Sequence, residues 1–364
     1  MPRKSCFPFA ALRPFLSLLV VLTWLIGLPS PHAARYRLAR AEGRVVIYSV
    51  TDAKRVRPLI ARFEARYPGV RVDYREMNSL ALHRRFLDDL AQRRDGADLL
   101  WSSAMDLQIK LVNDGHAQAY RTAEAHALPD WAGYRHQAWA TTFEPVVIAY
   151  HRQRLPEAQV PRSHLALTRL LERHPARWRG RLATYDIERS AVGFSFLAHD
   201  ERIGGEAIWR LVRRLGEARV ELHATTEAMV ERLVSGEIDL AYNAVGSYVL
   251  ARAASDPRIG FVFPHDYTLV LSRIAVIPRA ARRPHAARLW LDFLLSREGQ
   301  RLLSDQHLLS IRWDGGDELG AADLTRILRD SVKPIQPGPG LLALQDQRNR
   351  AALIARWRKE VGRR

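Results

Sequence analysis

The sequence is nearly devoid of cysteine. Cys6 is the only one, and it lies in an N-terminal segment that we expect to be removed. A chain without further thiols has no internal disulfide, no thiolate metal site and no cysteine nucleophile. The histidines form neither an H-E-x-x-H motif nor a close pair, so the sequence gives no indication of zinc.

Two other kinds of catalytic motif are also missing. There is no glycine-rich nucleotide loop and no G-x-S-x-G nucleophile elbow. We therefore expect a protein that is not an enzyme and that carries neither cofactor nor metal. The formal charge is +17, almost entirely from arginine. Because no nucleic-acid recognition motif is present, we do not expect a nucleic-acid partner. The basic side chains either only cover solvent-exposed helix faces or also help to attract anionic solutes.

The first 34 residues have the layout of a secretory signal peptide. Three cations precede an apolar run, residues 15–28, and small residues follow at Ala33 and Ala34. The run of 14 residues is shorter than the ~20 that span a bilayer, so we expect cleavage, with a retained membrane anchor as the alternative. No cysteine follows the run, which argues against a lipid anchor. The sequence therefore predicts a periplasmic protein.

Residues 43–74 read as strand, loop, helix and second strand. Val45 to Tyr48 is an apolar run typical of a buried parallel strand. A helical stripe follows at i, i+3, i+4 and i+7, formed by Val56, Leu59, Ile60 and Phe63. Pro58 is expected in a late first turn of this helix. The loop after the first strand lies where open α/β sheets bind ligands.

Similar strand–loop–helix units recur in two blocks, and hydrophobic residues make up 47% of the chain, enough for two cores. Two long extended runs, residues 139–150 and 267–277, separate the blocks. We predict an α/β protein with two lobes and a ligand cleft between them. The expected parts are a leader (1–34), a first lobe (35–142), a second lobe (143–267), and a return to the first lobe with C-terminal helices that pack on both lobes (268–364).

Two predicted helix starts in the second lobe are candidate anion sites, because the first amides of a helix lack intrahelical partners and carry partial positive charge. Ser190 heads one helix, and Gly193 behind it admits close backbone approach; the alternative is that Ser190 only caps its helix. Gly246 and Ser247 open the other.

Charged and amide side chains complete the predicted site. Arg189 and Arg273 are candidates to pair with an oxyanion, and Arg273 interrupts an apolar run. Asn243, at a strand end, is expected either to form a hydrogen bond with a solute oxygen or to close an Asx turn. Asp52 is expected to cap a helix. Small hydroxyl residues are expected to face the cleft from the first lobe: Ser49, Thr51, Ser102 and Ser103.

Six segments carry a resemblance to a known family. They are VVIYSVTD, FEARYPGVRVDY, ADLLWSSAMD, SGEIDLAYN, GSYVLARA and ARLWLDFLLSREGQ. In their order and spacing the chain resembles type 2 periplasmic solute-binding proteins of ABC importers, in the branch near the ferric-iron-binding proteins. This resemblance implies two lobes that close on a solute and deliver it to an inner-membrane ABC permease.

The chain departs from the iron-binding pattern of that family. The resemblance implies two adjacent ligating tyrosines where this chain has Val245 and Gly246, a His at Asp52 and a Glu at Ser103. The segment DYTLVLSR is instead similar to binding proteins for phosphorylated compounds. We therefore expect a small anionic solute, such as a sugar phosphate, phosphoglycerate, phosphonate or carboxylate. The alternatives are a ferric-iron carrier and a sensor subunit that signals to a membrane histidine kinase.

Overall fold

The structure is a computed structural model that describes residues 31–315 and 319–363. Most of the predicted leader lies outside the described residues. Helix α1 (Pro31–Glu42) crosses the expected cleavage point, so its first turn contains Ala33 and Ala34. Within the described part of the chain, no helix is both long and apolar enough to span a bilayer.

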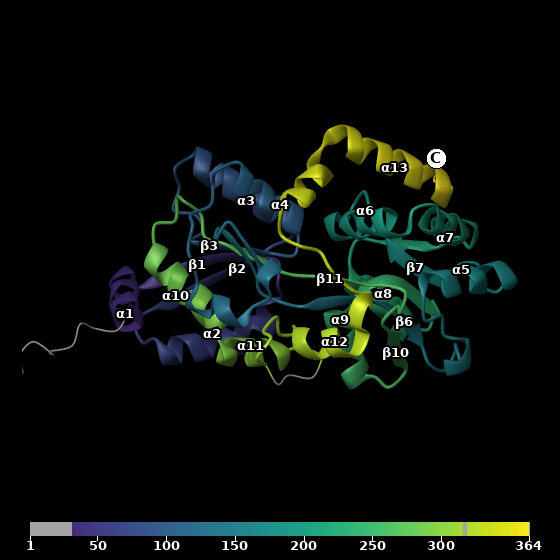
Figure 1. Ribbon diagram of the computed structural model, residues 1–364, viewed down its shortest axis with the longest axis horizontal. Helices are drawn as coiled ribbons and strands as arrows, with labels where there is room; N and C mark the ends of the chain where they lie inside the picture. The colour runs from purple at the N-terminus through teal and green to yellow at the C-terminus, as the bar shows by residue number, and fades with distance from the viewer. Residues whose placement is uncertain (1–30, 316–318, 364) are drawn as a thin grey trace, which may run out of the picture.

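Two β-sheets form the cores of two lobes, which lie side by side in Figure 1. The expected two-lobed α/β fold is thereby confirmed. In order across the first sheet, the strands are β2 (Arg71–Glu76), β1 (Arg44–Ser49), β3 (Leu99–Ser102), β12 (Ile274–Val276), β5 (Ala138–Ala140) and β4 (Gly133–Tyr134). In the second they are β13 (Val332–Pro334), β11 (Thr268–Leu271), β6 (Glu144–His151), β9 (Leu240–Val245), β7 (Leu182–Tyr185) and β8 (Glu221–His223), and β10 (Ile259–Val262) pairs with β6.

Helices cover both sheets, and their apolar stripes form the cores. The helices of the first lobe are α1, α2 (Ala53–Arg66), α3 (Ser79–Ala91), α4 (Met105–Asn113), α10 (Pro284–Leu295) and α11 (Arg297–Ser304). The helices of the second are α5 (His164–Arg173), α6 (Ala191–Gly204), α7 (Glu206–Glu217), α8 (Thr226–Val234) and α9 (Gly246–Ser255). The stripe predicted in α2 is buried at Val56, Leu59 and Phe63. The helix begins at Ala53, so Pro58 lies inside it and the expectation of a late first turn is wrong.

The chain crosses between the lobes at two adjacent segments. Residues 141–143 connect β5 to β6, and Ser272 with Arg273 connects β11 to β12. The two crossings are hydrogen-bonded to each other, because Thr141 N donates to the Arg273 carbonyl at 2.9 Å and Arg273 N donates to Thr142 Oγ1 at 2.9 Å. Strand β11 still belongs to the second sheet, so the chain returns at residue 272, a few residues beyond the predicted boundary.

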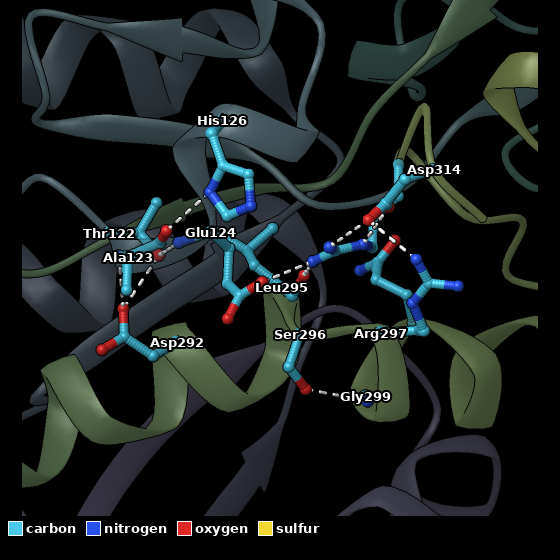
Figure 2. A network of polar contacts seen from close by, with 12 residues as sticks. Thr122, Ala123, Glu124, His126, Asp292, Leu295, Ser296, Arg297, Gly299 and Asp314 are labelled. Atoms are coloured by element: carbon cyan, nitrogen blue, oxygen red, sulfur yellow. Dashed lines mark hydrogen bonds and ion pairs between the residues drawn. The ribbon is translucent and has the colours of Figure 1, made fainter. Parts of the chain in front are cut away.

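A polar network holds the segment that follows α4 against the return helices of the first lobe. Figure 2 shows Thr122, Glu124, Asp292 and Asp314 within it. Thr122 Oγ1 donates to Asp292 at 2.8 Å, and the same carboxylate pairs with Arg35 of α1. These contacts tie residues that are far apart in sequence into one rigid lobe.

The C-terminal segment connects the two lobes a second time. It runs from α12 (Ala321–Leu328) and β13 through a 3₁₀ helix, Pro339–Gln345, to α13 (Gln347–Val361). The 3₁₀ helix packs on α4 of the first lobe, and α13 packs on α7 of the second. In Figure 1, α12 lies low in the centre of the molecule, and α13 arches above α6 and α7 of the second lobe.

Candidate solute-binding cleft

A cleft of about 410 Å³ lies between the lobes and receives residues from both of them. Its first-lobe wall contains Val50, Asp52, Asn78, Ser79, Leu80 and Ser103. The second lobe contributes Tyr185, Arg189, Ser190, Ala191, Val192, Ala224, Thr225, Thr226, Glu227, Val245 and Tyr248. The floor of the cleft is formed by Leu271, which precedes the second crossing, and by Arg273, which lies within it.

A wider and more open depression of about 650 Å³ lies at the amino end of β1. Two of its three cations are already paired, since Arg44 and Arg283 both bind Asp95. All its residues come from the first lobe, so lobe closure would not enclose a solute there. The interlobe cleft is therefore the candidate binding site.

Six helices begin at this cleft: α2, α3 and α4 from the first lobe, and α6, α8 and α9 from the second. Asn78 caps α3 by accepting from Ala81 N at 2.9 Å, and Ser103 lies just before α4. Ser190 Oγ accepts from Gly193 N at 3.1 Å at the start of α6, and Thr225 caps α8. The other first-turn amides of a helix have no carbonyl partner in that helix, and they carry partial positive charge. The cleft is thus lined with oriented N–H dipoles from both sides.

Arg189 is the exposed cation of the cleft. It sits immediately before the α6 cap, and no hydrogen bond or ion pair joins its guanidinium to any described residue. The loop behind it is anchored, because Asp186 accepts from Glu188 N at 3.0 Å and pairs with Arg363 at 2.8 Å. A free guanidinium on a fixed loop is suited to bidentate binding of an oxyanion.

Arg273 lies at the floor of the cleft, but its charge is already neutralised. The side chain is 1% exposed and its Nε lies 2.9 Å from Glu144 Oε1. It also donates to Thr51 Oγ1 at 2.9 Å, and its Nη2 lies 3.4 Å from the Tyr248 hydroxyl. Burial opposes the charged guanidinium, yet the Glu144 carboxylate raises the pKa of Arg273 above its ordinary value. In this structure Arg273 joins the two lobes at the hinge.

Several residues predicted to line the cleft lie behind its wall. Ser49 Oγ accepts from Thr51 N, and Ser102 Oγ accepts from Ala104 N. Ser247 donates to the buried Glu144 carboxylate. These hydroxyl groups bind the backbone of their own loops or the hinge, which leaves them outside the lining of the cleft.

The remaining second-lobe predictions are explained by packing. A Cβ on Gly193 would lie 2.3 Å from the Tyr185 Cβ, and one on Gly246 would lie 2.5 Å from the Pro145 carbonyl oxygen. Asn243 has a φ of 60° and donates to Asp200 at 2.7 Å, away from the cleft. The side chain forms no Asx turn, and Asn243 does not line the cleft. Of the predicted ligand residues, the cleft lining brings together Ser103, Arg189, Ser190 and Arg273.

Sequence reasoning missed or misassigned part of the lining. Asp52 occupies the N-cap position of α2, but its side chain forms no capping hydrogen bond, so the expected cap is wrong. Glu227, Asn78 and Ser79 were not considered. A signal existed for Glu227, because it follows Thr225, the cap of α8, by two residues and so lies at the same helix start.

The tyrosines of the cleft are engaged with protein groups. The Tyr185 hydroxyl is hydrogen-bonded to Thr226 Oγ1, and burial raises its pKa. Burial also raises the pKa of Tyr248. Within residues 31–315 and 319–363, no group of three or more His, Cys, Asp or Glu side chains is arranged to hold a metal ion.

Comparison with known proteins agrees with this architecture. The family model described as "Bacterial extracellular solute-binding protein" matches residues 45–308. The substrate-binding protein of an ABC transporter from Agrobacterium tumefaciens is 36% identical, with a TM-score of 0.82, over 87% of this chain and 94% of that one. No curated protein sequence matches.

More distant structures share the fold. Iron-bound HitA from Pseudomonas aeruginosa is 18% identical with a TM-score of 0.70, over 87% of this chain and 99% of that one. The ferric-binding protein from Campylobacter jejuni is 17% identical with a TM-score of 0.68, over the same shares of the two chains. The chain belongs to the bacterial extracellular solute-binding proteins, the family of periplasmic solute-binding components of ABC transporters.

Proposed function

We propose that this protein captures a small anionic solute in the interlobe cleft and delivers it to an inner-membrane ABC permease. Phosphorylated compounds and carboxylates are the candidate solutes. The observation that carries the proposal is Arg189, a guanidinium unpaired among the described residues that borders a cleft on which six helix starts converge. Delivery to a permease is supported by the family to which the chain belongs.

An acidic group of the solute would lie against Arg189 and the first amides of α6. Ser190 caps that helix through Gly193 N, so the next amides, of Ala191 and Val192, are available to an oxyanion. Serine hydroxyls from the first lobe, at Ser79 and Ser103, face this position across the cleft. Closure of the lobes about the two crossings would remove water and strengthen each of these contacts.

Ferric iron is the alternative in the same fold, and the cleft chemistry favours it less. Ferric ion favours anionic oxygen ligands such as phenolate, but burial raises the pKa values of Tyr185 and Tyr248 and so disfavours phenolates. Arg273 lowers the pKa of Tyr248, but its positive charge lies beside that hydroxyl and would repel a ferric ion bound there. The distant iron-binding structures are less than 25% identical and support the fold alone.

Calorimetric titration of the periplasmic protein tests the proposal. The panel contains sugar phosphates, phosphoglycerates, phosphonates, di- and tricarboxylates, and ferric citrate. We expect an anion to bind, and Arg189→Ala to weaken it on the order of tenfold or more. The matched control is Arg169→Ala, an exposed arginine of α5 outside the cleft.

Silence across the anion panel would contradict the proposal, as would equal effects of the two arginine substitutions. An iron-dependent visible absorption that a chelator removes would establish the ferric alternative. Co-purification with a permease distinguishes transport from a sensor role.

A further inference from the structure

Two carboxylates without partners face the cleft from opposite lobes. Asp52 comes from the loop before α2, and Glu227 lies in the first turn of α8. No hydrogen bond or ion pair connects either carboxylate to another residue in the described part of the chain. They share the cleft with the guanidinium of Arg189, which is likewise unpaired among the described residues, so the lining has charges of both signs that form no ion pair.

The carboxylate of Asp52 does not form the capping hydrogen bond that is usual at its position. An Asp at an N-cap ordinarily accepts from a first-turn amide. Here Glu76 Oε2 accepts from Ala53 N at 2.8 Å, so an amide at the start of α2 is satisfied from β2. Asp52 remains half-buried and lines the cleft.

The neighbouring cation does not neutralise Asp52 by direct contact. Arg55 donates to the Gln306 carbonyl at 2.6 Å, and its guanidinium lies 4.9 Å from the centre of the Tyr248 ring. Arg273 is bound to Glu144. Neither guanidinium is hydrogen-bonded to Asp52. Arg55, whose Nη1 is buried without a hydrogen-bond partner among the described residues, attracts the Asp52 carboxylate only through space.

The two carboxylates act on the same small region. Burial raises the pKa of the Tyr248 hydroxyl, Arg273 lowers it, and Glu227 and Asp52 both raise it further. Their fields thus overlap at one side chain that lines the cleft. When the lobes close, both carboxylates lose water and approach one another, which is unfavourable unless a cation enters between them. A solute hydroxyl would satisfy one lone pair but would leave the charge uncompensated.

We propose that the solute carries a protonated amine as well as its acidic group, with the amine held between Asp52 and Glu227. The inference rests on the proposed function, because it places the acidic group at Arg189 and the α6 start. Arg189 and Glu227 belong to the same lobe, so one lobe binds both ends of the solute. Asp52 then reaches the amine from the other lobe only on closure.

Calorimetry with matched ligands tests this inference. The first pair is 2-aminoethyl phosphate and 2-hydroxyethyl phosphate; the second is 4-aminobutanoate and 4-hydroxybutanoate. In at least one pair we expect the amine to bind on the order of tenfold more tightly or better. Glu227→Gln and Asp52→Asn should each reduce that preference severalfold. Asp88→Asn, an exposed carboxylate of α3 outside the cleft, is the matched control and should change neither ligand.

The outcomes separate the two proposals. If the amine and hydroxyl ligands of each pair bind within threefold of each other, or if only anions without an amine bind, the inference fails and the proposed function stands. If no anion of either panel binds, both fail. An amine preference that survives both carboxylate substitutions would also overturn the inference, because the preference would then arise elsewhere.

Discussion

The ion pair between Arg273 and Glu144 makes a strong prediction about the hinge. Glu144 is fully buried, and Arg273 is 1% exposed. Arg273→Met would remove the guanidinium and leave the carboxylate buried with only Thr142 and Ser247 as hydrogen-bond donors. Removing one partner of a buried pair costs about 3–5 kcal/mol, because the remaining charge is uncompensated.

The expected loss of unfolding free energy at pH 7 is therefore about 3–5 kcal/mol. Replacement of both partners, Arg273→Met with Glu144→Met, should cost less than the sum of the single substitutions, since no buried charge remains. Urea unfolding, monitored by circular dichroism and tryptophan fluorescence, gives the unfolding free energies needed for this double-mutant cycle.

The pH dependence gives an independent check. In the native protein, burial raises the pKa of Glu144, but Arg273 and the hydrogen bonds lower it by more, so the net pKa is below its ordinary value. The native pair therefore contributes stability above about pH 4, the ordinary range of a glutamate, and loses it as the pH falls further. In Arg273→Met the isolated carboxylate has a raised pKa, so its cost should shrink between pH 7 and pH 5 as it takes up a proton. A loss below 1 kcal/mol, or one that does not depend on pH, would refute the reasoning.

Three further predictions concern single side chains. Ser190→Ala should lower the unfolding free energy by about 1 kcal/mol, because the Gly193 amide loses its cap; no change in urea midpoint would contradict this. Burial lowers the pKa of His199 to about 4, so its protonation favours the unfolded chain, and about 3 kcal/mol of stability is lost as the pH falls from 6.5 toward 4. His199→Gln should flatten that pH profile, and an unaltered slope would count against it. Phe63→Ala should cost about 3–5 kcal/mol in urea unfolding, since this buried ring contacts Trp290 and Phe293; a loss below 1 kcal/mol would be inconsistent with the packing.

Local pattern was sufficient for the elements that begin each lobe. The apolar run at Val45 to Tyr48 forms β1, and the stripe through Phe63 forms the buried side of α2. Thr225 and Ser190 cap α8 and α6 as their positions indicate. These features depend on residues within a few positions of one another, which is why periodicity and capping rules can predict them.

Electrostatic roles were less accessible to the sequence. Arg273 was expected to pair with a solute because it interrupts an apolar run, but its partner Glu144 lies 129 residues earlier in the chain. Ser103 and Asp106 fit a capping box, yet α4 begins after Ala104 and the Asp106 carboxylate accepts from Gln345 of the C-terminal segment. In each case a partner distant in sequence satisfies the polar group.

The sequence alone determined the two α/β blocks, the crossings between them and the capped starts of α6 and α8, because each depends on short-range hydrophobic spacing and backbone geometry. Only the tertiary structure decided which charges are free. It paired Arg273 with Glu144 and satisfied the start of α2 through Glu76, and it left Arg189, Asp52 and Glu227 without an ion-pair partner among the described residues. The physical reason is that a charge is available to a solute only when folding brings no opposite charge to it, and that depends on the whole chain.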